Sequence, residues 1–187
     1  MADVAATLGD ASSKMDKAVT VAKEDFASIR TGRANPALFN KIMVDYYGTY
    51  TALSQLASIQ VPEARMAIVS PFDKGAMANI EKAIRDSDLG LNPATSGDLI
   101  RVPMPTLTEE RRKDLIKVVR AEAESAKVAV RNIRRDANDS LKKSLKEKEM
   151  SEDDERRSQE EVQKITDKFI AEIDKLLQLK ESELLAI

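Results

Sequence analysis

The sequence predicts an α+β protein in which a long three-helix bundle is interrupted by a small β/α/β domain. Apolar residues recur at helical spacing near both ends of the chain, whereas the stretch between Pro36 and Pro103 contains short runs rich in β-branched residues. Gly and Pro residues stand where one pattern changes to the other. We therefore assign residues 1–30 and 106–187 to the bundle and residues 31–105 to the inserted domain.

Three helices are predicted for the bundle. The first runs from Ala5 to about Arg30, because apolar residues follow alternating steps of three and four along it. The second follows a capping box at Thr106 to Glu109, and a break near Met150 separates it from the third, for which Ser151 is the predicted N-cap. Long helices joined by a short turn pack antiparallel, so we expect one bundle.

The inserted domain is predicted to contain four strands and one helix. The strands are expected at 41–46, 57–61, 66–69 and 99–102, and the helix from Asp73 to Asp86. The chain enters the domain at 31–34 and leaves it at 103–105. Two crossings restrain the domain, while Gly32 permits backbone rotation, so we predict a hinge made of Thr31, Gly32, Pro103, Met104 and Pro105. A rigid corner between two packed domains is the alternative.

Composition argues against an enzyme. The chain has no His and no Cys, which removes imidazole bases, thiolate nucleophiles, disulfides and the common zinc ligands, and it has no phosphate-binding loop motif. Asp88 and Asp98 are only loosely placed candidates for a carboxylate pair. The acids of Glu152 to Glu155 fit the first turn of a helix better than a metal site. We therefore predict no catalytic residue, no metal and no cofactor.

The sequence also indicates where the protein acts. No run of about 18 apolar residues occurs, so no membrane span is expected. The N-terminus has neither a secretory apolar core nor an Arg-rich transit pattern, so we expect a water-soluble cytoplasmic protein.

The most informative feature is a series of cations on the second long helix. Between Arg111 and Arg135 nine cations stand against three acids, although the whole chain carries a net charge of −2. Arg131 lies about 200° around the helix from the apolar Ile133, so the series faces away from the predicted core. Lys127, Arg131 and Arg135 form a like-charge ladder at i,i+4 spacing, which costs a helix a few tenths of a kcal/mol per pair. Arginine suits bidentate phosphate contacts, so we predict salt-sensitive RNA binding.

Two other interpretations compete with RNA binding. In the first interpretation, the cations are simply the solvent-exposed face of a helix. In the second, the protein is a non-catalytic coiled-coil adaptor whose long helices bind protein partners. Neither accounts for the like-charge ladder, and the adaptor gives the inserted domain no purpose. Tyr46 and Tyr47 are candidate base-stacking residues, but we expect instead that one ring packs in the core and the other faces solvent.

Several motifs resemble those of the bacterial ribosome recycling factors. They include Ile29-Arg30-Thr31-Gly32-Arg33-Ala34, Val44-Asp45-Tyr46-Tyr47-Gly48, Ser87-Asp88-Leu89-Gly90-Leu91-Asn92-Pro93, Val128 to Asn138, and Arg156-Arg157-Ser158-Gln159. The resemblance extends from about Met15 to Leu185. One departure is Thr106, where the family often has Pro; Thr106 either alters the stiffness of the hinge region or caps the following helix.

The resemblance implies an L-shaped, monomeric factor that binds the post-termination ribosome, mainly through large-subunit ribosomal RNA. With elongation factor G and GTP it would promote dissociation of the ribosome into subunits and release from mRNA. Matching positions give RNA contacts at Arg112, Arg131, Arg134 and Arg135, with Arg30 and Arg33 near the hinge. Together with the cations of the helix, the predicted RNA-binding set is Arg30, Arg33, Arg112, Lys117, Arg120, Lys127, Arg131, Arg134 and Arg135.

Overall fold

The computed structural model describes residues 4–186 and divides the chain into two compact units. The described part of Met1–Phe26 and Ile116–Ile187 forms one unit, and Ala27–Leu115 forms the other. Residues 27–30 and 106–115 thus belong by their contacts to the smaller unit, whereas the sequence pattern groups them with the helices. Within residues 4–186, no helix is both long enough and apolar enough to cross a membrane.

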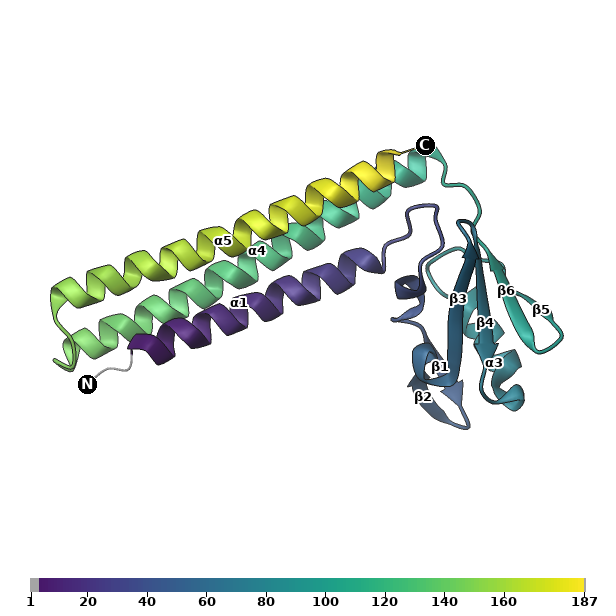
Figure 1. Cartoon of the computed structure of the whole chain (residues 1–187), viewed down its shortest axis with the longest axis horizontal. Helices are drawn as coiled ribbons and strands as arrows, with labels where there is room; N and C mark the ends of the chain where they lie inside the picture. The colour runs from purple at the N-terminus through teal and green to yellow at the C-terminus, as the bar shows by residue number, and fades with distance from the viewer. Residues whose placement is uncertain (1–3, 187) are drawn as a thin grey trace. The chain divides into compact units, whose positions relative to one another are not determined.

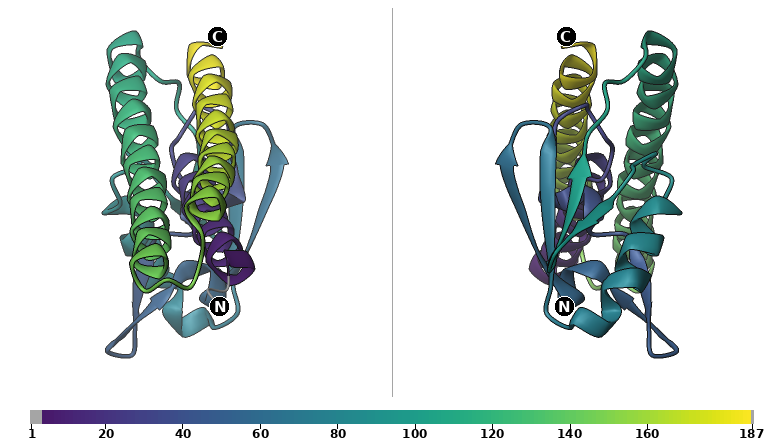
Figure 2. Two further views of the ribbon diagram at one scale, coloured as in Figure 1. Left: turned by 90° about the vertical axis from the view of Figure 1, so that its left-hand side faces the viewer. Right: turned by 90° about the vertical axis from the view of Figure 1, so that its right-hand side faces the viewer.

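Three long helices build the first unit, as predicted. These are α1 (Val4–Ala27), α4 (Glu109–Lys146) and α5 (Glu152–Leu185), which lie side by side with α4 antiparallel to the other two (Figures 1 and 2). The first helix ends at Ala27, three residues before the predicted end. Pattern alone did not locate this end, because Ile29 continues the apolar spacing beyond it.

Apolar side chains from all three helices form the core of the bundle. Met15 and Val19 of α1, Val130 of α4, and Val162 and Ile173 of α5 are all at most 1% exposed. Burying a side chain of this size contributes about 1.5–3 kcal/mol. The helical spacing read from the sequence therefore identifies the packed faces correctly.

The helix starts show one confirmed prediction and one wrong one. Ser151 caps α5, since its hydroxyl accepts a hydrogen bond from the backbone N–H of Asp154 at 3.1 Å. The predicted capping box beginning at Thr106 is wrong: α4 begins at Glu109, and Thr108 accepts from the N–H of Arg111 at 3.2 Å. The hydroxyl of Thr106 instead accepts a hydrogen bond from Arg65.

The second unit contains a four-stranded antiparallel sheet in the order β3-β4-β6-β5 and a separate β1-β2 hairpin. The strands are β1 (Met43–Tyr46), β2 (Thr49–Ala52), β3 (Ala57–Glu63), β4 (Met66–Pro71), β5 (Ala94–Ser96) and β6 (Leu99–Pro103) (Figure 1). The helical elements are η1 (Pro36–Phe39), α2 (Leu53–Leu56), η2 (Lys74–Ala76) and α3 (Met77–Arg85). Phe39, Leu53, Ile80, Ile84 and Ile100 are fully buried in its core.

The four predicted strands and the predicted helix are confirmed within a few residues. β2 and β5 were not predicted, because β5 is three residues long and has no buried residue, and β2 lacks the apolar alternation of a half-buried strand. The α+β fold class, with a β/α/β unit interrupting a helical bundle, is confirmed.

Both segments predicted as a hinge are bonded to the turn between β3 and β4. The N–H of Ala34 donates to the carbonyl of Ala64 at 2.7 Å, and the N–H of Met104 donates to the carbonyl of Arg65 at 2.8 Å. Gly32 has φ +88°, a conformation that favours glycine. The turn at Ala64 and Arg65 therefore joins the entering and leaving segments within the second unit. Rotation at Thr31, Gly32 and 103–105 stays a prediction.

Candidate nucleic-acid interface

Seven of the nine predicted RNA-binding residues lie on α4. This 38-residue helix is continuous, so residue spacing sets the direction of each side chain. At about 100° per residue, Lys117, Arg120, Lys127 and Arg135 project within about 40° of Arg131. A single helix face thus carries most of the predicted set. Arg112, nearer the start of the helix, is half-buried and belongs by contacts to the second unit.

Three of these cations are paired with acids in the first unit. Arg120 Nε lies 2.5 Å from Glu181 Oε1, Arg131 Nη1 lies 2.8 Å from Glu124 Oε1, and Lys127 is paired with Asp174.

The like-charge ladder is therefore partly neutralised, which cation spacing alone does not predict. The side chain of Lys127 is only 17% exposed, and its ion pair joins α4 to α5. Lys127 thus has a structural role in the bundle and is poorly placed to contact RNA.

A shallow depression of 340 Å³ gathers the C-terminal part of the cationic face. Its lining consists of Arg131, Asn132, Arg134, Arg135, Asn138, Asp139, Lys142 and Gln163. Among residues 4–186, neither Arg135 nor Lys142 has an ion pair or a hydrogen-bond partner for its side chain. The depression therefore presents four cations, two of them unpaired, beside neutral amides and a single acid, Asp139, and this excess of positive charge favours a phosphate and its sugar.

The predicted set did not include five of the residues that line this depression, among them the acid Asp139. Lys142 belongs to the same cationic series, and Asn132 and Asn138 lie within the Val128 to Asn138 motif, so the sequence did contain a signal for them. Gln163 comes from α5 and carries no such signal, because only the packing of α5 on α4 brings it there.

Arg30 is held by its own unit and does not face solvent. It is 9% exposed, and its guanidinium donates to the carbonyls of Leu89, at 3.1 Å, and Pro105. Burial lowers the pKa of Arg30, with smaller contributions from the nearby charges of Arg111 and Arg65. Its Nε atom has no partner among the described residues. Arg33, in contrast, is exposed.

The rings of Tyr46 and Tyr47 differ in exposure, as the sequence predicted. Tyr46 packs against the core, while Tyr47 is 76% exposed. Both hydroxyls donate to Asp73 Oδ2, at 3.0 and 3.1 Å, and the N–H of Gly75 donates to Asp73 Oδ1 at 2.8 Å. The Gly75 N–H, followed by the two hydroxyls, lowers the pKa of Asp73. This carboxylate thus fastens the tip of the β1-β2 hairpin to the loop before α3.

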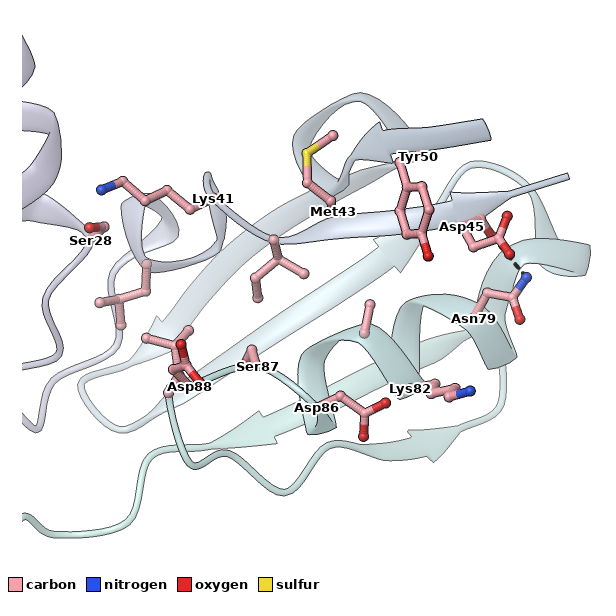
Figure 3. A pocket seen from close by; sticks show the side chains of 14 residues that line it. Ser28, Lys41, Met43, Asp45, Tyr50, Asn79, Lys82, Asp86, Ser87 and Asp88 are labelled. Carbon is pink, nitrogen blue, oxygen red and sulfur yellow. Dashed lines mark hydrogen bonds between the residues drawn. The ribbon is translucent and has the colours of Figure 1, made fainter. Parts of the chain in front are cut away.

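A larger concavity, of 660 Å³, lies between the β1-β2 hairpin and α3. Figure 3 shows Met43 and Tyr50 on the hairpin side and Lys82 and Asp86 on the α3 side. Both signs of charge line it, so it does not select an anionic partner. Asp88 lines this concavity, but Asp98 does not and is paired with Lys74 at 2.8 Å. The two candidate catalytic carboxylates therefore do not form a pair.

The fold is that of a protein in which a small antiparallel β/α/β unit interrupts the chain of a three-helix bundle. Comparison with known families agrees with this class, since the profile described as "Ribosome recycling factor" matches residues 22–185. The chain belongs to the ribosome recycling factor family. This family consists of non-catalytic factors, in agreement with the prediction that the chain is not an enzyme.

Curated relatives support the assignment over nearly the whole chain. The ribosome-recycling factor of Methylobacillus flagellatus is 61% identical over 177 residues, covering 95% of this chain and 96% of the relative. That of Streptomyces avermitilis is 58% identical over 181 residues, covering 97% and 98%. Both relatives are bacterial proteins.

Solved structures are similar too. A solution structure of a ribosome recycling factor is 40% identical, has a TM-score of 0.76 and covers 100% of both chains. A second structure describes the T. thermophilus ribosome recycling factor and the E. coli elongation factor G bound to the E. coli post-termination complex. Its matching chain is 49% identical, has a TM-score of 0.68 and covers 98% of this chain and 99% of its own.

Proposed function

We propose that this protein binds the post-termination ribosome and, with elongation factor G and GTP, promotes its dissociation into subunits and release from mRNA. The observation that carries the proposal is the likeness, at 49% identity over nearly the whole chain, to a factor described on that complex with elongation factor G. On this proposal the protein acts as a monomer in the bacterial cytoplasm and hydrolyses nothing itself.

The exposed cationic face of α4 is the part of the molecule that we assign to ribosomal RNA of the large subunit. Arg135 and Lys142 have no side-chain partner among residues 4–186, and the depression around them is open to solvent. Phosphate contacts position a protein on RNA without reading sequence, which suits a factor that must act on every ribosome. Lys117, Arg120 and Arg131 extend the face, whereas Arg30 and Lys127 are better explained by structural roles.

Subunit splitting tests the proposal directly. Purified post-termination ribosomes are mixed with the protein, elongation factor G and GTP, and the loss of intact ribosomes is followed by light scattering. We expect splitting that requires all three components. Absence of splitting by the folded native chain would refute the proposed function and leave a protein-binding adaptor as the explanation of the long helices.

A further inference from the structure

The side chain of Arg134 is connected to α5 through an amide and a carboxylate. Arg134 Nη1 donates to Gln163 Oε1 at 3.3 Å, and Gln163 Nε2 donates to Asp167 Oδ1 at 2.7 Å. The amide orientation of Gln163 follows from its neighbours, because a guanidinium can only donate and a carboxylate can only accept. The three side chains therefore form a directed chain of hydrogen bonds from arginine to carboxylate.

This series of hydrogen bonds ends on a cation that lines the proposed RNA-binding depression. Arg134 and Gln163 both line the depression, while Asp167 lies one turn further along α5. Arg134 is half-buried, unlike the exposed Arg131 and Arg135 on either side. An arginine held by one nitrogen keeps its other donors available, and fixing it in advance reduces the entropy lost on binding.

We propose that Gln163 and Asp167 are positioning residues that orient Arg134 for a phosphate of ribosomal RNA. Asp167 accepts from the amide of Gln163 and fixes its rotation, and Gln163 in turn directs the guanidinium. A neutral amide suits this task, because an acid next to Arg134 would pair with it and compete with phosphate. The inference rests on the proposed function and adds two α5 residues to it.

A purely electrostatic role and a positioning role of Asp167 predict opposite effects of Asp167→Ala on RNA binding. Removing a negative charge near an RNA-binding surface strengthens binding if only the charge matters. If Asp167 positions Arg134 through Gln163, Asp167→Ala weakens binding although the surface becomes more positive. Asp167→Asn keeps an acceptor oxygen and is expected to weaken binding less than Asp167→Ala.

The experiment measures affinity for purified large ribosomal subunits by fluorescence anisotropy. Because the chain contains no cysteine, one label is attached through Ser54→Cys at an exposed position of the second unit. We expect Gln163→Ala and Asp167→Ala each to weaken binding about two- to tenfold. In an Arg134→Ala background, Gln163→Ala is expected to have no further effect, because no guanidinium remains to be oriented.

Gln159 supplies the matched control. Its amide also donates to a carboxylate on α5, that of Glu155, but within residues 4–186 it makes no hydrogen bond to an arginine. Gln159→Ala is expected to leave affinity unchanged, and circular dichroism confirms that every variant is folded. Tighter or unchanged binding by Asp167→Ala would overturn the inference, and so would an undiminished effect of Gln163→Ala in the Arg134→Ala background. In either case, binding by the native chain leaves the proposed function standing. Absence of binding by the native chain overturns both.

Discussion

The guanidinium of Arg131 donates to the carboxylate of Glu124, seven residues earlier on α4, at 2.8 Å. Both side chains are accessible, with 44% of Arg131 and 57% of Glu124 exposed. A carboxylate and a phosphate each offer arginine two acceptor oxygens that can receive a pair of N–H donors. Glu124 therefore occupies one donor of Arg131 and places a negative charge beside it, so Glu124 competes with an RNA phosphate for this arginine.

Replacing this carboxylate should strengthen RNA binding. Exposed ion pairs contribute about 0.2–1 kcal/mol, so we expect Glu124→Gln to bind large ribosomal subunits up to about fivefold more tightly. Glu122→Gln is the control, since Glu122 is an exposed acid on the same helix that has no ion pair within residues 4–186. An equal gain from both substitutions would show a general charge effect and no competition for Arg131.

Substitution of Arg135 should weaken RNA binding, whereas substitution of Lys127 should lower the stability of the bundle. Arg135→Ala removes an unpaired exposed cation, so we expect binding about tenfold weaker or more and a free energy of unfolding changed by less than about 0.5 kcal/mol. Lys127→Ala removes the ion pair with Asp174 and a largely buried stem, so we expect a loss of about 1 kcal/mol in the free energy of unfolding and little change in binding. Urea unfolding and subunit binding are measured for both variants; the reverse assignment would contradict these structural roles.

Arg30→Ala should destabilise the second unit. The substitution leaves the carbonyls of Leu89 and Pro105 without this donor, and a buried unpaired group costs about 1–3 kcal/mol, so we expect a loss of about 2 kcal/mol in the free energy of unfolding. Arg30→Lys should restore only part of it, because an ammonium does not reproduce the guanidinium fork. Unchanged stability with weaker subunit binding would instead make Arg30 the RNA contact that its sequence motif suggests.

Asp73 should make the hairpin sensitive to acid. Its pKa lies below the ordinary value of 3.8 in the folded protein, so its contribution to stability is complete above that value and is lost as pH falls through the folded-state pKa. We expect Asp73→Asn to lower Tm near neutral pH and the difference from the native chain to shrink as the solution is made acidic. A difference in Tm that does not depend on pH would show that the carboxylate charge is not what fastens Tyr46 and Tyr47.

Periodic patterns predicted the elements that large apolar faces define. The spacing of Met15, Ala22, Val162 and Ile173 located two packed helix faces, and the cation spacing on α4 located the exposed face opposite them. The first residues of helices were harder to predict, because any Ser or Thr three residues before an acid fits a capping box, whether or not a helix begins there. Thr106 fits that pattern, yet its hydroxyl binds Arg65, which lies 41 residues away in sequence.

Interactions between distant segments account for most of what pattern could not supply. Lys127 and Arg135 lie about 40° to either side of Arg131 on a helical projection, but Asp174 of α5 pairs only with Lys127. The sequence around Arg30 gives no sign that this side chain is buried. Only folding of the second unit places the carbonyls of Leu89 and Pro105 around it. Gln163 likewise reaches the cationic face through the packing of α5 on α4.

The salt dependence of binding to large ribosomal subunits tests the central claim, that the cationic face of α4 binds RNA phosphates. Affinity is measured over a range of salt concentrations for the native chain and for the Arg131→Ala, Arg135→Ala double variant. We predict that native binding weakens steeply with salt, and that the variant binds more weakly with a slope smaller by about 0.7–0.9 for each phosphate that it no longer binds. Equal affinities and equal slopes for the two proteins, both folded, would contradict the claim.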